Sequence, residues 1–341
     1  MIIGFCGDIM LGENLFHLGR GIRTRYKNNY KSLIRKDILN NLVSDIEAFV
    51  FNFEYSLFQE DNQCGINPYK LVYRGEIESI DFIKQFGNIL ISNIANNHFA
   101  QHGIASTEFT IQTLLDNNFR IIGKPFSSYD ICDDKQVIKI WGTSLINENY
   151  YPNSYWLTSK HELLQFFCDK FKSQEEFWIL FIHWGDEYIP KPSKEIIDLA
   201  HKLIDAKIDL IVGHHPHVIQ SIELYKNRYI FYSLGNFIFD QNFSNETSEG
   251  YFVLFDTTKG KIHNLYKTKQ SDYSIQEYFK MEPLLENFSD TYNFADQNEI
   301  IRIQAKYRKA MKFEYLRNIY RTSPLVPLFL VNNLLFKKIC V

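Results

Sequence analysis

The sequence lacks the long apolar segments that cross membranes, since no uninterrupted apolar stretch reaches about 18 residues. The first residues, "MIIGFCGD", lack the basic and apolar regions of a secretory signal peptide, so we expect a cytoplasmic protein. The five cysteines show no CxxC or zinc-finger spacing, which favours reduced thiols over a disulfide framework. No GxxxxGK[S/T] loop is present, and this excludes an ATP-driven ligase of the P-loop kind.

A strong charge of either sign is also missing. The 341 residues carry a formal net charge of −3, which gives no reason to expect a nucleic acid as partner. With 45% hydrophobic residues the composition is that of an ordinary globular protein. At about 150 residues per domain, the length allows two domains or one large domain with an appendage.

Short apolar runs alternate with amphipathic helical stretches over the first 280 residues or so. This alternation predicts an α/β domain whose sheet is covered on both faces. From about residue 285 the sequence turns helical and more polar, notably over 298–320. We expect strands at 2–6, 46–52, 89–95, 120–123, 136–146, 177–184, 208–213, 229–235 and 251–256.

Side chains that can bind metals stand at the ends of five of these strands. One Asp or Asn in such a place commonly caps the next helix. Five such strand ends together indicate a metal site, because the carboxyl ends of strands in α/β sheets gather the ligand-binding loops. In chain order the residues are Asp8, Asn52, Glu54, Asn96, Asn97, His98, His183, His214, His215 and His217.

The types of these side chains indicate which metals bind. Carboxylates, amide oxygens and imidazoles together suit Mn²⁺, Fe or Zn²⁺ better than Mg²⁺ or Ca²⁺. The candidates outnumber the ligands of one structural zinc ion. We therefore expect two divalent transition metals about 3.5–4 Å apart that share a carboxylate, the arrangement that serves phosphoester hydrolysis.

Several segments occur in a characteristic order: "GDIML", "NFEYSL", "ANNH", "HWGDEY" and "GHHPHVIQSIELYKNRYIFYSLGNFIFDQ". Over roughly residues 2–245 they resemble the signature of the CapA family of poly-γ-glutamate capsule-biosynthesis proteins. The resemblance implies a calcineurin-like metallophosphoesterase fold, with layered β-sheets flanked by helices, over residues 1–280. Residues 281–341 would form a C-terminal helical extension.

The resemblance also implies roles for individual residues. His98 would face the substrate as a general acid or as a stabiliser of the transition state. The implied metal ligands are Asp8 for the first metal, Glu54 as the bridging carboxylate, Asn97, His183 and His215 for the second metal, and His217 for the first.

Four further residues are candidate contacts for the substrate, namely Arg74, Asn96, Glu187 and His214. We expect His214 beside the ligands rather than on a metal. Glu187 also fits an exposed loop carboxylate. The guanidinium of Arg74 suits a phosphate or a carboxylate, although an ordinary surface arginine fits equally well.

Two positions depart from the family pattern. The metallophosphoesterase motif D-x-H places a histidine two residues after the aspartate, where this sequence has Met10, so the first metal is one ligand short. Gln101 stands three residues after His98, where CapA-like proteins often have an aspartate. A lost supporting carboxylate would loosen the orientation of a ligand, which puts catalytic activity in question.

Three functions are compatible with these residues. The first is a binuclear metal-dependent hydrolase of the phosphoesterase type, linked to capsule or surface-polymer biosynthesis, in which His98 protonates the leaving group. The second is a non-catalytic, metal-binding accessory protein of poly-γ-glutamate or capsular-polymer assembly, and the third is a scaffold with a vestigial site. In the first two the partner is an anionic small molecule or polymer, such as a phosphoester, a sugar phosphate or a γ-glutamyl chain.

The last residues, "SPLVPLFLVNNLLFKKICV" (323–341), combine a short apolar run with Lys337 and Lys338. One interpretation is a final helix packed on the domain. The alternative is a peripheral anchor at the inner face of the membrane, because apolar residues beside lysines favour an anionic membrane surface.

Overall fold

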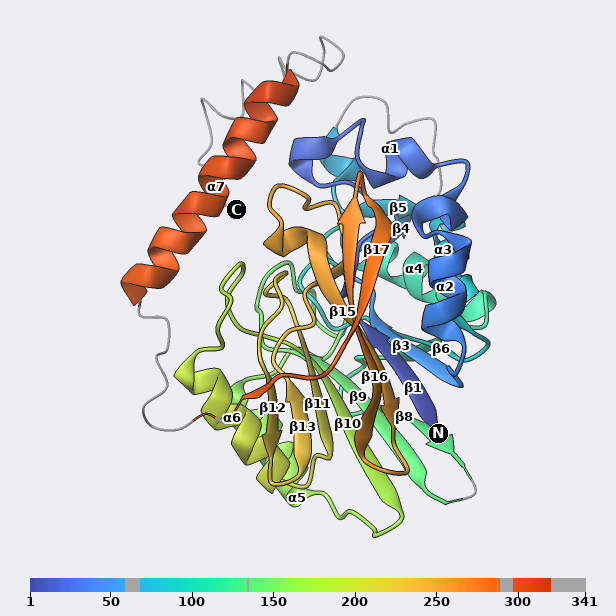
Figure 1. The fold of residues 1–341 in the computed structure, drawn as a ribbon, viewed down its shortest axis with the longest axis vertical. Helices are drawn as coiled ribbons and strands as arrows, with labels where there is room; N and C mark the ends of the chain where they lie inside the picture. Colours follow the sequence, from blue (N-terminus) through green and yellow to red (C-terminus); the bar gives the residue numbers. More distant parts are fainter. Residues whose placement is uncertain (59–67, 134, 287, 289–296, 320–341) are drawn as a thin grey trace.

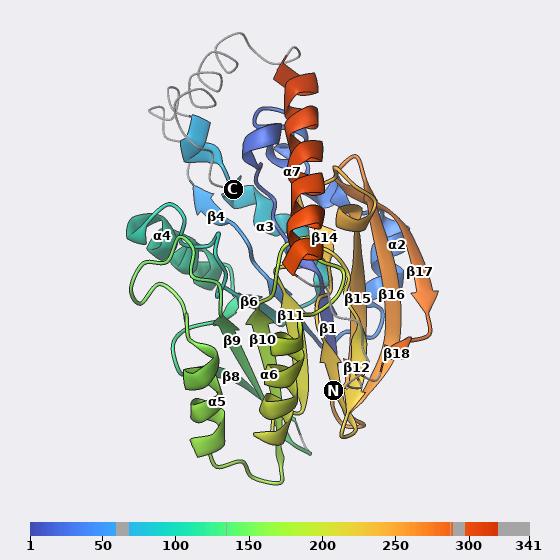
Figure 2. The same cartoon turned by 90° about the vertical axis from the view of Figure 1, so that its left-hand side faces the viewer.

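The computed structural model describes residues 1–58, 68–133, 135–286, 288 and 297–319. In this part of the chain, two seven-stranded sheets pack against each other and helices cover their outer faces (Figures 1 and 2). The predicted fold class, layered β-sheets flanked by helices with a helix at the C-terminal end, is confirmed.

The first sheet has the strand order β17-β16-β15-β1-β3-β6-β7. Its centre is parallel from β1 through β3 and β6 to β7, whereas β15 runs antiparallel to β1. Its strands are β1 (Ile2–Cys6), β3 (Ala48–Asn52), β6 (Leu90–Asn93), β7 (Arg120–Ile122), β15 (Glu249–Asp256), β16 (Lys261–Ser271) and β17 (Ser274–Met281).

The second sheet has the order β18-β12-β13-β11-β10-β9-β8. Here β9, β10, β11 and β13 are parallel, and antiparallel strands flank them. Its strands are β8 (Ser128–Cys132), β9 (Val137–Ser144), β10 (Glu176–His183), β11 (Leu210–His214), β12 (Ile222–Tyr225), β13 (Arg228–Phe231) and β18 (Leu285–Glu286).

Short elements complete the fold. Two pairs of short strands lie outside the large sheets, β2 (Asp8–Ile9) with β14 (Asn236–Ile238) and β4 (Ser56–Phe58) with β5 (Arg74–Glu76). The α-helices are α1 (Ile22–Tyr26), α2 (Lys36–Val43), α3 (Ile80–Ile83), α4 (Ile104–Asp116), α5 (Lys160–Asp169), α6 (Lys194–Asp205) and α7 (Gln297–Ile319). The 3₁₀ segments are η1 (Leu15–His17), η2 (Tyr30–Leu33), η4 (Pro68–Leu71), η5 (Ile77–Ser79), η6 (Lys84–Phe86) and η7 (Glu246–Ser248).

Alternation along the strands divides the apolar side chains between layers. In β3, Phe49 and Phe51 pack on the α2 side of the first sheet, whereas Val50 packs between the two sheets. In β10, Phe181 joins the layer between the sheets and Leu180 packs on the side of α6. Successive side chains of a strand point to opposite faces, so runs that are apolar throughout bury both faces of each sheet.

All nine runs in which we expected strands contain one, and the helical stretch expected over 298–320 corresponds to α7. The division of the chain at residue 280 remains a prediction. Among the described residues, no helix combines the length and the apolar character needed to cross a bilayer. The segment 323–341 lies outside the described residues.

Candidate metal centre

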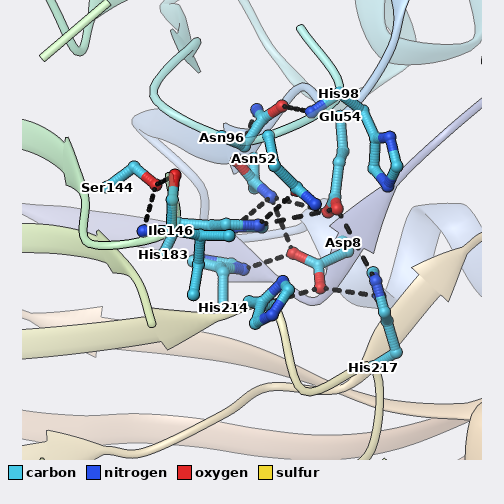
Figure 3. Close-up of polar contacts among 12 residues, drawn as sticks. Asp8, Asn52, Glu54, Asn96, His98, Ser144, Ile146, His183, His214 and His217 are labelled. Atoms are coloured by element: carbon cyan, nitrogen blue, oxygen red, sulfur yellow. Dashed lines mark hydrogen bonds and ion pairs between the residues drawn. The ribbon is translucent and has the colours of Figure 1, made fainter. Parts of the chain in front are cut away.

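The parallel strands of both sheets end at one common edge, where their polar side chains converge (Figure 3). Asn52 and Asn93, the last residues of β3 and β6, are in register with each other. In the second sheet His183 and His214, the last residues of β10 and β11, are likewise in register. The strand ends therefore bring the sequence-predicted residues together.

Asn52 connects the two carboxylates of the site, which are both completely buried. Its Nδ2 group donates to Asp8 Oδ1 at 2.8 Å and to Glu54 Oε2 at 3.0 Å. Its Oδ1 atom accepts hydrogen bonds from Asn93 and Asn96 at 3.1 and 3.2 Å. Asn52 thus orients both carboxylates and is itself held in one amide orientation.

The imidazoles approach these carboxylates from the second sheet. His214 Nδ1 lies 2.8 Å from Asp8 Oδ1, and His217 Nδ1 lies 3.3 Å from Asp8 Oδ2. Glu54 Oε1 lies 3.7 Å from His183 Nε2 and 3.6 Å from His217 Nε2. Each carboxylate is therefore bordered by two imidazoles.

Among the described residues, two groups of side chains have ligand atoms close enough to hold one ion each. One group is Glu54, His215 and His217, and the other is Asp8, Glu54 and His183, with all ligand atoms of a group within 4.8 Å of one another. Glu54 belongs to both groups, which is the geometry that a bridging carboxylate needs. The groups divide the other residues differently from the roles that the resemblance implies, because Asp8 is grouped with His183, and His215 with His217.

Several buried polar atoms of the site lack hydrogen-bond partners among the described residues, and this bears on whether metals fit here. Glu54 Oε1, His215 Nδ1 and His217 Nε2 are buried and have no hydrogen-bond partner among the described residues. Buried polar atoms are rarely left unpaired without a functional reason. Carboxylate and imidazole donors that converge in this way fit divalent transition metals.

The pKa values of the two carboxyl groups, Asp8 and Glu54, are shifted in opposite directions. Burial alone would raise the pKa of Asp8, but His214 and His217 outweigh it and hold that pKa well below its ordinary value. Burial raises the pKa of Glu54, and the charges of Asp8 and Glu187 raise it further. A cation between the two groups would therefore displace a proton from Glu54.

Two of the imidazoles are kept neutral. Burial, reinforced by neighbouring imidazoles, lowers the pKa of His183 well below its ordinary value and that of His215 to about 3. Neutral imidazole is the form that binds metals. His217 differs, because its contacts with Asp8 outweigh burial and raise its pKa.

The loop "GHHPH" adopts an unusual backbone to present these rings. His215 has φ 98° and His217 has φ 56°, both in the left-handed region that non-glycine residues rarely occupy. A Cβ atom on Gly213 would lie 2.1 Å from the carbonyl oxygen of Tyr232, so glycine is required where β11 passes β13. Strained backbone of this kind clusters at functional sites.

Asn97 and His98 follow β6 at the rim of the site. Asn97 Oδ1 lies 3.0 Å from His183 Nε2, so the two predicted ligands of the second metal are in contact. The ring of His98 stacks on Tyr73 with 3.7 Å between centroids, and its Nδ1 lies 2.9 Å from Gln101 Oε1. Gln101 thus contacts His98 from the position where CapA-like proteins often carry an aspartate.

The protonation of His98 bears on its predicted role. Burial lowers its pKa to about 4, so the ring is neutral at neutral pH. Because Gln101 Oε1 can only accept, the proton of the neutral ring sits on Nδ1 and leaves Nε2 as an acceptor. Action as a general acid therefore requires an anionic substrate that stabilises the protonated ring.

A cavity of about 640 Å³ opens beside the candidate metal ligands. Asn97, His98 and Glu187 line it, together with the aromatic rings of Tyr73 and Tyr188. The volume is in the range of small-molecule sites. Glu187 is half-buried and borders this cavity, so the structure does not place it on an exposed loop surface.

Three of the four predicted substrate contacts, Arg74, Asn96 and His214, lie outside the cavity lining. Arg74 donates to Lys70 O and Ser106 Oγ, and its guanidinium packs over the ring of Phe58. Asn96 is fully buried, and its Oδ1 accepts from the backbone N–H groups of residues 98 and 99. The structure gives Asn96 a loop-organising position, and all three substrate contacts remain predictions.

Sequence reasoning missed two supporting contacts. It singled out Asn52 only for its position at a strand end, not for the hydrogen bonds that join two carboxylates. It also did not foresee that Asn236 Oδ1 lies 3.0 Å from His217 Nδ1. Met10, at the position of the missing histidine, is buried, and its sulfur accepts a hydrogen bond from the Gly12 N–H group.

The layered sheets and the carboxylate, amide and imidazole side chains at their joined strand ends define a metallophosphoesterase-like protein. Residues 2–140 and 147–241 match a sequence model of the family described as "Bacterial capsule synthesis protein PGA_cap", and the chain belongs to this family. The resemblance to capsule-biosynthesis proteins is thus confirmed.

Two curated relatives come from bacilli. The chain is 31% identical over 253 residues to "Capsule biosynthesis protein CapA" of Bacillus anthracis, which covers 70% of this chain and 59% of that protein. It is 32% identical over 258 residues to "PGA biosynthesis protein CapA" of Bacillus subtilis (strain 168), with 70% and 63% covered. The chain thus spans about three fifths of the length of these relatives.

Solved structures resemble the chain more distantly. A crystal structure of a hypothetical protein from Thermus thermophilus matches 82% of this chain and 98% of its own, with a TM-score of 0.42 and 11% identity.

Proposed function

We propose that this protein is a binuclear metal-dependent hydrolase of the phosphoesterase type that acts on an anionic substrate in the biosynthesis of a surface polymer. The observation that carries the proposal is the position of Glu54, which belongs to both groups of side chains that could hold a metal ion. Two metals in these groups would supply Lewis acidity and an activated water molecule.

The chain's own residues would bind and orient the substrate. Asn97 and His98 line the cavity next to the ligand groups, so an anionic group held there lies within reach of both side chains. The stacking of His98 on Tyr73 and its contact with Gln101 fix the ring in one orientation. A fixed ring can stabilise charge on the substrate without reorganisation during the reaction.

The link to a capsular polymer rests on the relatives. Two of them carry names that refer to capsule or PGA biosynthesis. A γ-glutamyl chain and a sugar phosphate are both anionic, and each suits a site with two divalent cations.

An accessory role without catalysis is the second candidate. A protein of Mycobacterium tuberculosis that is 30% identical over 94 residues is named "Probable polyglutamine synthesis accessory protein". The neutral His98 also fits a site that binds an anion without donating a proton. In this case the metals would hold the polymer.

Metal content and turnover separate the two candidates. The purified protein is stripped with a chelator and reloaded with Mn²⁺, Fe²⁺ or Zn²⁺. Bound metal is counted by elemental analysis, and hydrolysis of p-nitrophenyl phosphate mono- and diesters is measured. Two equivalents of metal with turnover support the hydrolase, and two equivalents without turnover of any ester or amide tested support the accessory role.

A pair of histidine variants ties the turnover to this site. His98→Asn should lower turnover by about 10²–10⁴-fold with metal content unchanged, the usual contribution of a positioned proton-transfer group. His263→Asn is the matched control, because His263 is partly exposed and lies near Asp45 on the surface. Equal turnover of both variants would reject the role of His98, and binding of fewer than two metals would reject the binuclear site.

A further inference from the structure

The wall of the cavity beside the candidate metal ligands carries negative charge. Two carboxylates, Glu148 and Glu187, line the cavity, and no lysine or arginine of the described residues does. Two histidines also line it, but burial lowers the pKa of His98 to about 4 and also lowers that of His102, so neither ring adds a positive charge at neutral pH. The wall therefore suits a cationic group, whereas metals bound beside it would suit an anionic one.

Glu187 is a half-buried carboxylate whose side chain forms no hydrogen bond or ion pair with the described residues. Burial raises its pKa, although the charges of His217 and Arg308 oppose the rise. Arg308 is exposed on α7 and is not part of the cavity lining. Glu187 also belongs to neither group of side chains that could hold a metal ion. Because a carboxylate removed from water is costly without a partner, a cation from a ligand would stabilise it.

Glu148 is held near the candidate metal centre by Asn97. Asn97 Nδ2 donates to Glu148 Oε2 at 3.2 Å, and the Tyr155 hydroxyl donates to the Glu148 carbonyl oxygen at 3.3 Å. The other end of the same amide, Asn97 Oδ1, lies 3.0 Å from the candidate metal ligand His183 Nε2. One amide group therefore separates Glu148 from the candidate ligands, so a cation at Glu148 would lie close to an anionic group on the metals.

A buried acceptor on His98 points independently to a ligand that donates hydrogen bonds. His98 is 9% exposed and lines the cavity. Its Nδ1 lies 2.9 Å from Gln101 Oε1, which can only accept, so the neutral ring carries its proton on Nδ1. Nε2 is then an acceptor, and it has no hydrogen-bond partner among the described residues. Buried polar atoms are rarely left unpaired, so this atom favours a ligand with an N–H or O–H group.

We propose that the substrate of this cavity is zwitterionic: its phosphoester group lies on the metals, and a primary ammonium group on a short linker pairs with Glu187 and Glu148, with His98 Nε2 as a further acceptor. The rings of Tyr73 and Tyr188, which also line the cavity, would add to the attraction, because aromatic rings attract cations. This inference rests on the proposed function, because it requires the anionic group to bind the metals. It goes further by making an amine the group that the cavity selects.

The affinities of the Mn²⁺-loaded protein for 2-aminoethyl phosphate and for propyl phosphate, measured by calorimetry, test this proposal. The probes match in size, and at about pH 8 both phosphates are dianions. Metals alone would favour propyl phosphate, because the ammonium group of the other probe is repelled by them. We expect the amine probe to bind about tenfold to a hundredfold more tightly, the range for hydrogen bonds to charged groups. If the esters are turned over, the ratio of kcat/KM replaces the ratio of affinities.

Glutamine variants locate the ammonium group. Glu187→Gln should lower the preference for the amine probe about tenfold or more, and Glu148→Gln should lower it about twofold to fivefold, since Glu148 is exposed. In both variants the affinity for propyl phosphate should not fall, and metal content should stay unchanged. Glu277→Gln is the matched control, because it removes the same charge from an exposed position on β17 and should keep the wild-type preference.

A wild-type protein without a preference for the amine probe would overturn the proposal, as would a Glu187→Gln variant that keeps the full preference. Loss of metal from Glu187→Gln, with weaker binding of both probes, would also overturn it, because Glu187 would then serve the metals. Turnover of both esters is followed in the same samples. Preference for the amine without turnover supports this inference and rejects the hydrolase assignment, whereas turnover without preference does the reverse. Binding of neither probe rejects both.

Discussion

The two sheets contribute different chemistry to the metal centre. Strand ends of the first sheet deliver oxygen ligands, and those of the second deliver imidazoles. Neither half alone contains either group of side chains that could hold a metal ion, so these groups form only where the sheets pack together. The oxygen half comprises Asp8, Glu54 and Asn97, and the imidazole half comprises His183, His215 and His217.

The halves also differ in how their side chains are supported. The carboxylates are oriented by hydrogen bonds from Asn52. The imidazole His215 is positioned mainly by a strained backbone, and its Nδ1 atom has no hydrogen-bond partner among the described residues. Because Glu54 alone belongs to both ligand groups, we expect the loss of Glu54 to affect both metals and the loss of one imidazole to affect one.

The largest effect should come from Glu54→Gln. The amide keeps the shape of the side chain but removes the charge that both ligand groups share, so both metals should bind about a hundredfold more weakly or worse. Because burial raises the pKa of Glu54, metal binding to the wild type should release a proton that the variant does not release. Calorimetry in buffers of different ionisation enthalpy measures both effects, and two metals at unchanged affinity would show that Glu54 does not bridge.

His183→Ala should remove one metal and spare the other. His183 belongs to only one of the two ligand groups. His214→Ala is the informative comparison, because His214 contacts Asp8 and we expect it beside the ligands rather than on a metal. That variant should keep both equivalents with affinity lowered about 10–100-fold. Elemental analysis of both variants would reveal an incorrect assignment if His214→Ala loses a whole equivalent.

The sequence predicts the candidate ligands of this site better than the contacts that support them. Ligands at strand ends, such as Asp8 and His183, are predictable because parallel strands end at one edge of a sheet. Supporting contacts, such as the two hydrogen bonds that Asn52 donates, are not predictable from the sequence. The hydrogen-bond partners of an amide depend on residues that are far away in the chain. The position of Met311 in the cavity lining could not be predicted either, since helical periodicity shows that a face is buried but not what it packs against.

Asn52→Leu should have an intermediate effect on metal affinity, through the carboxylates of the oxygen half. The substitution keeps the branching of the side chain but leaves Asp8 and Glu54 without their shared donor, so we expect metal affinity to fall about 10–100-fold. It also strands the amide donors of Asn93 and Asn96, at a cost of about 1–3 kcal/mol each in the free energy of unfolding. Thermal unfolding with and without metal measures both consequences.

A surface asparagine provides the control for that variant. Asn41→Leu removes a hydrogen bond to the Asp37 carbonyl on the exposed side of α2 and should change neither metal affinity nor the melting temperature by much. If Asn52→Leu behaves like Asn41→Leu, the carboxylates are oriented by something other than Asn52.

The smallest effect should come from Met10→His, which would place an imidazole within the oxygen half. Met10 is buried in the apolar core on the α2 side of the first sheet, so an unpaired imidazole there should lower the free energy of unfolding by about 1–3 kcal/mol without metal. If the new ring reaches the first metal beside Asp8, its affinity should rise severalfold and added Mn²⁺ should recover part of the lost stability. Metal titrations followed by melting temperature separate the loss of stability without metal from the gain in metal affinity. Equal destabilisation with and without metal would mean that the introduced imidazole points into the core, as the sulfur of Met10 does. In that case the first metal site is complete without a ligand at position 10.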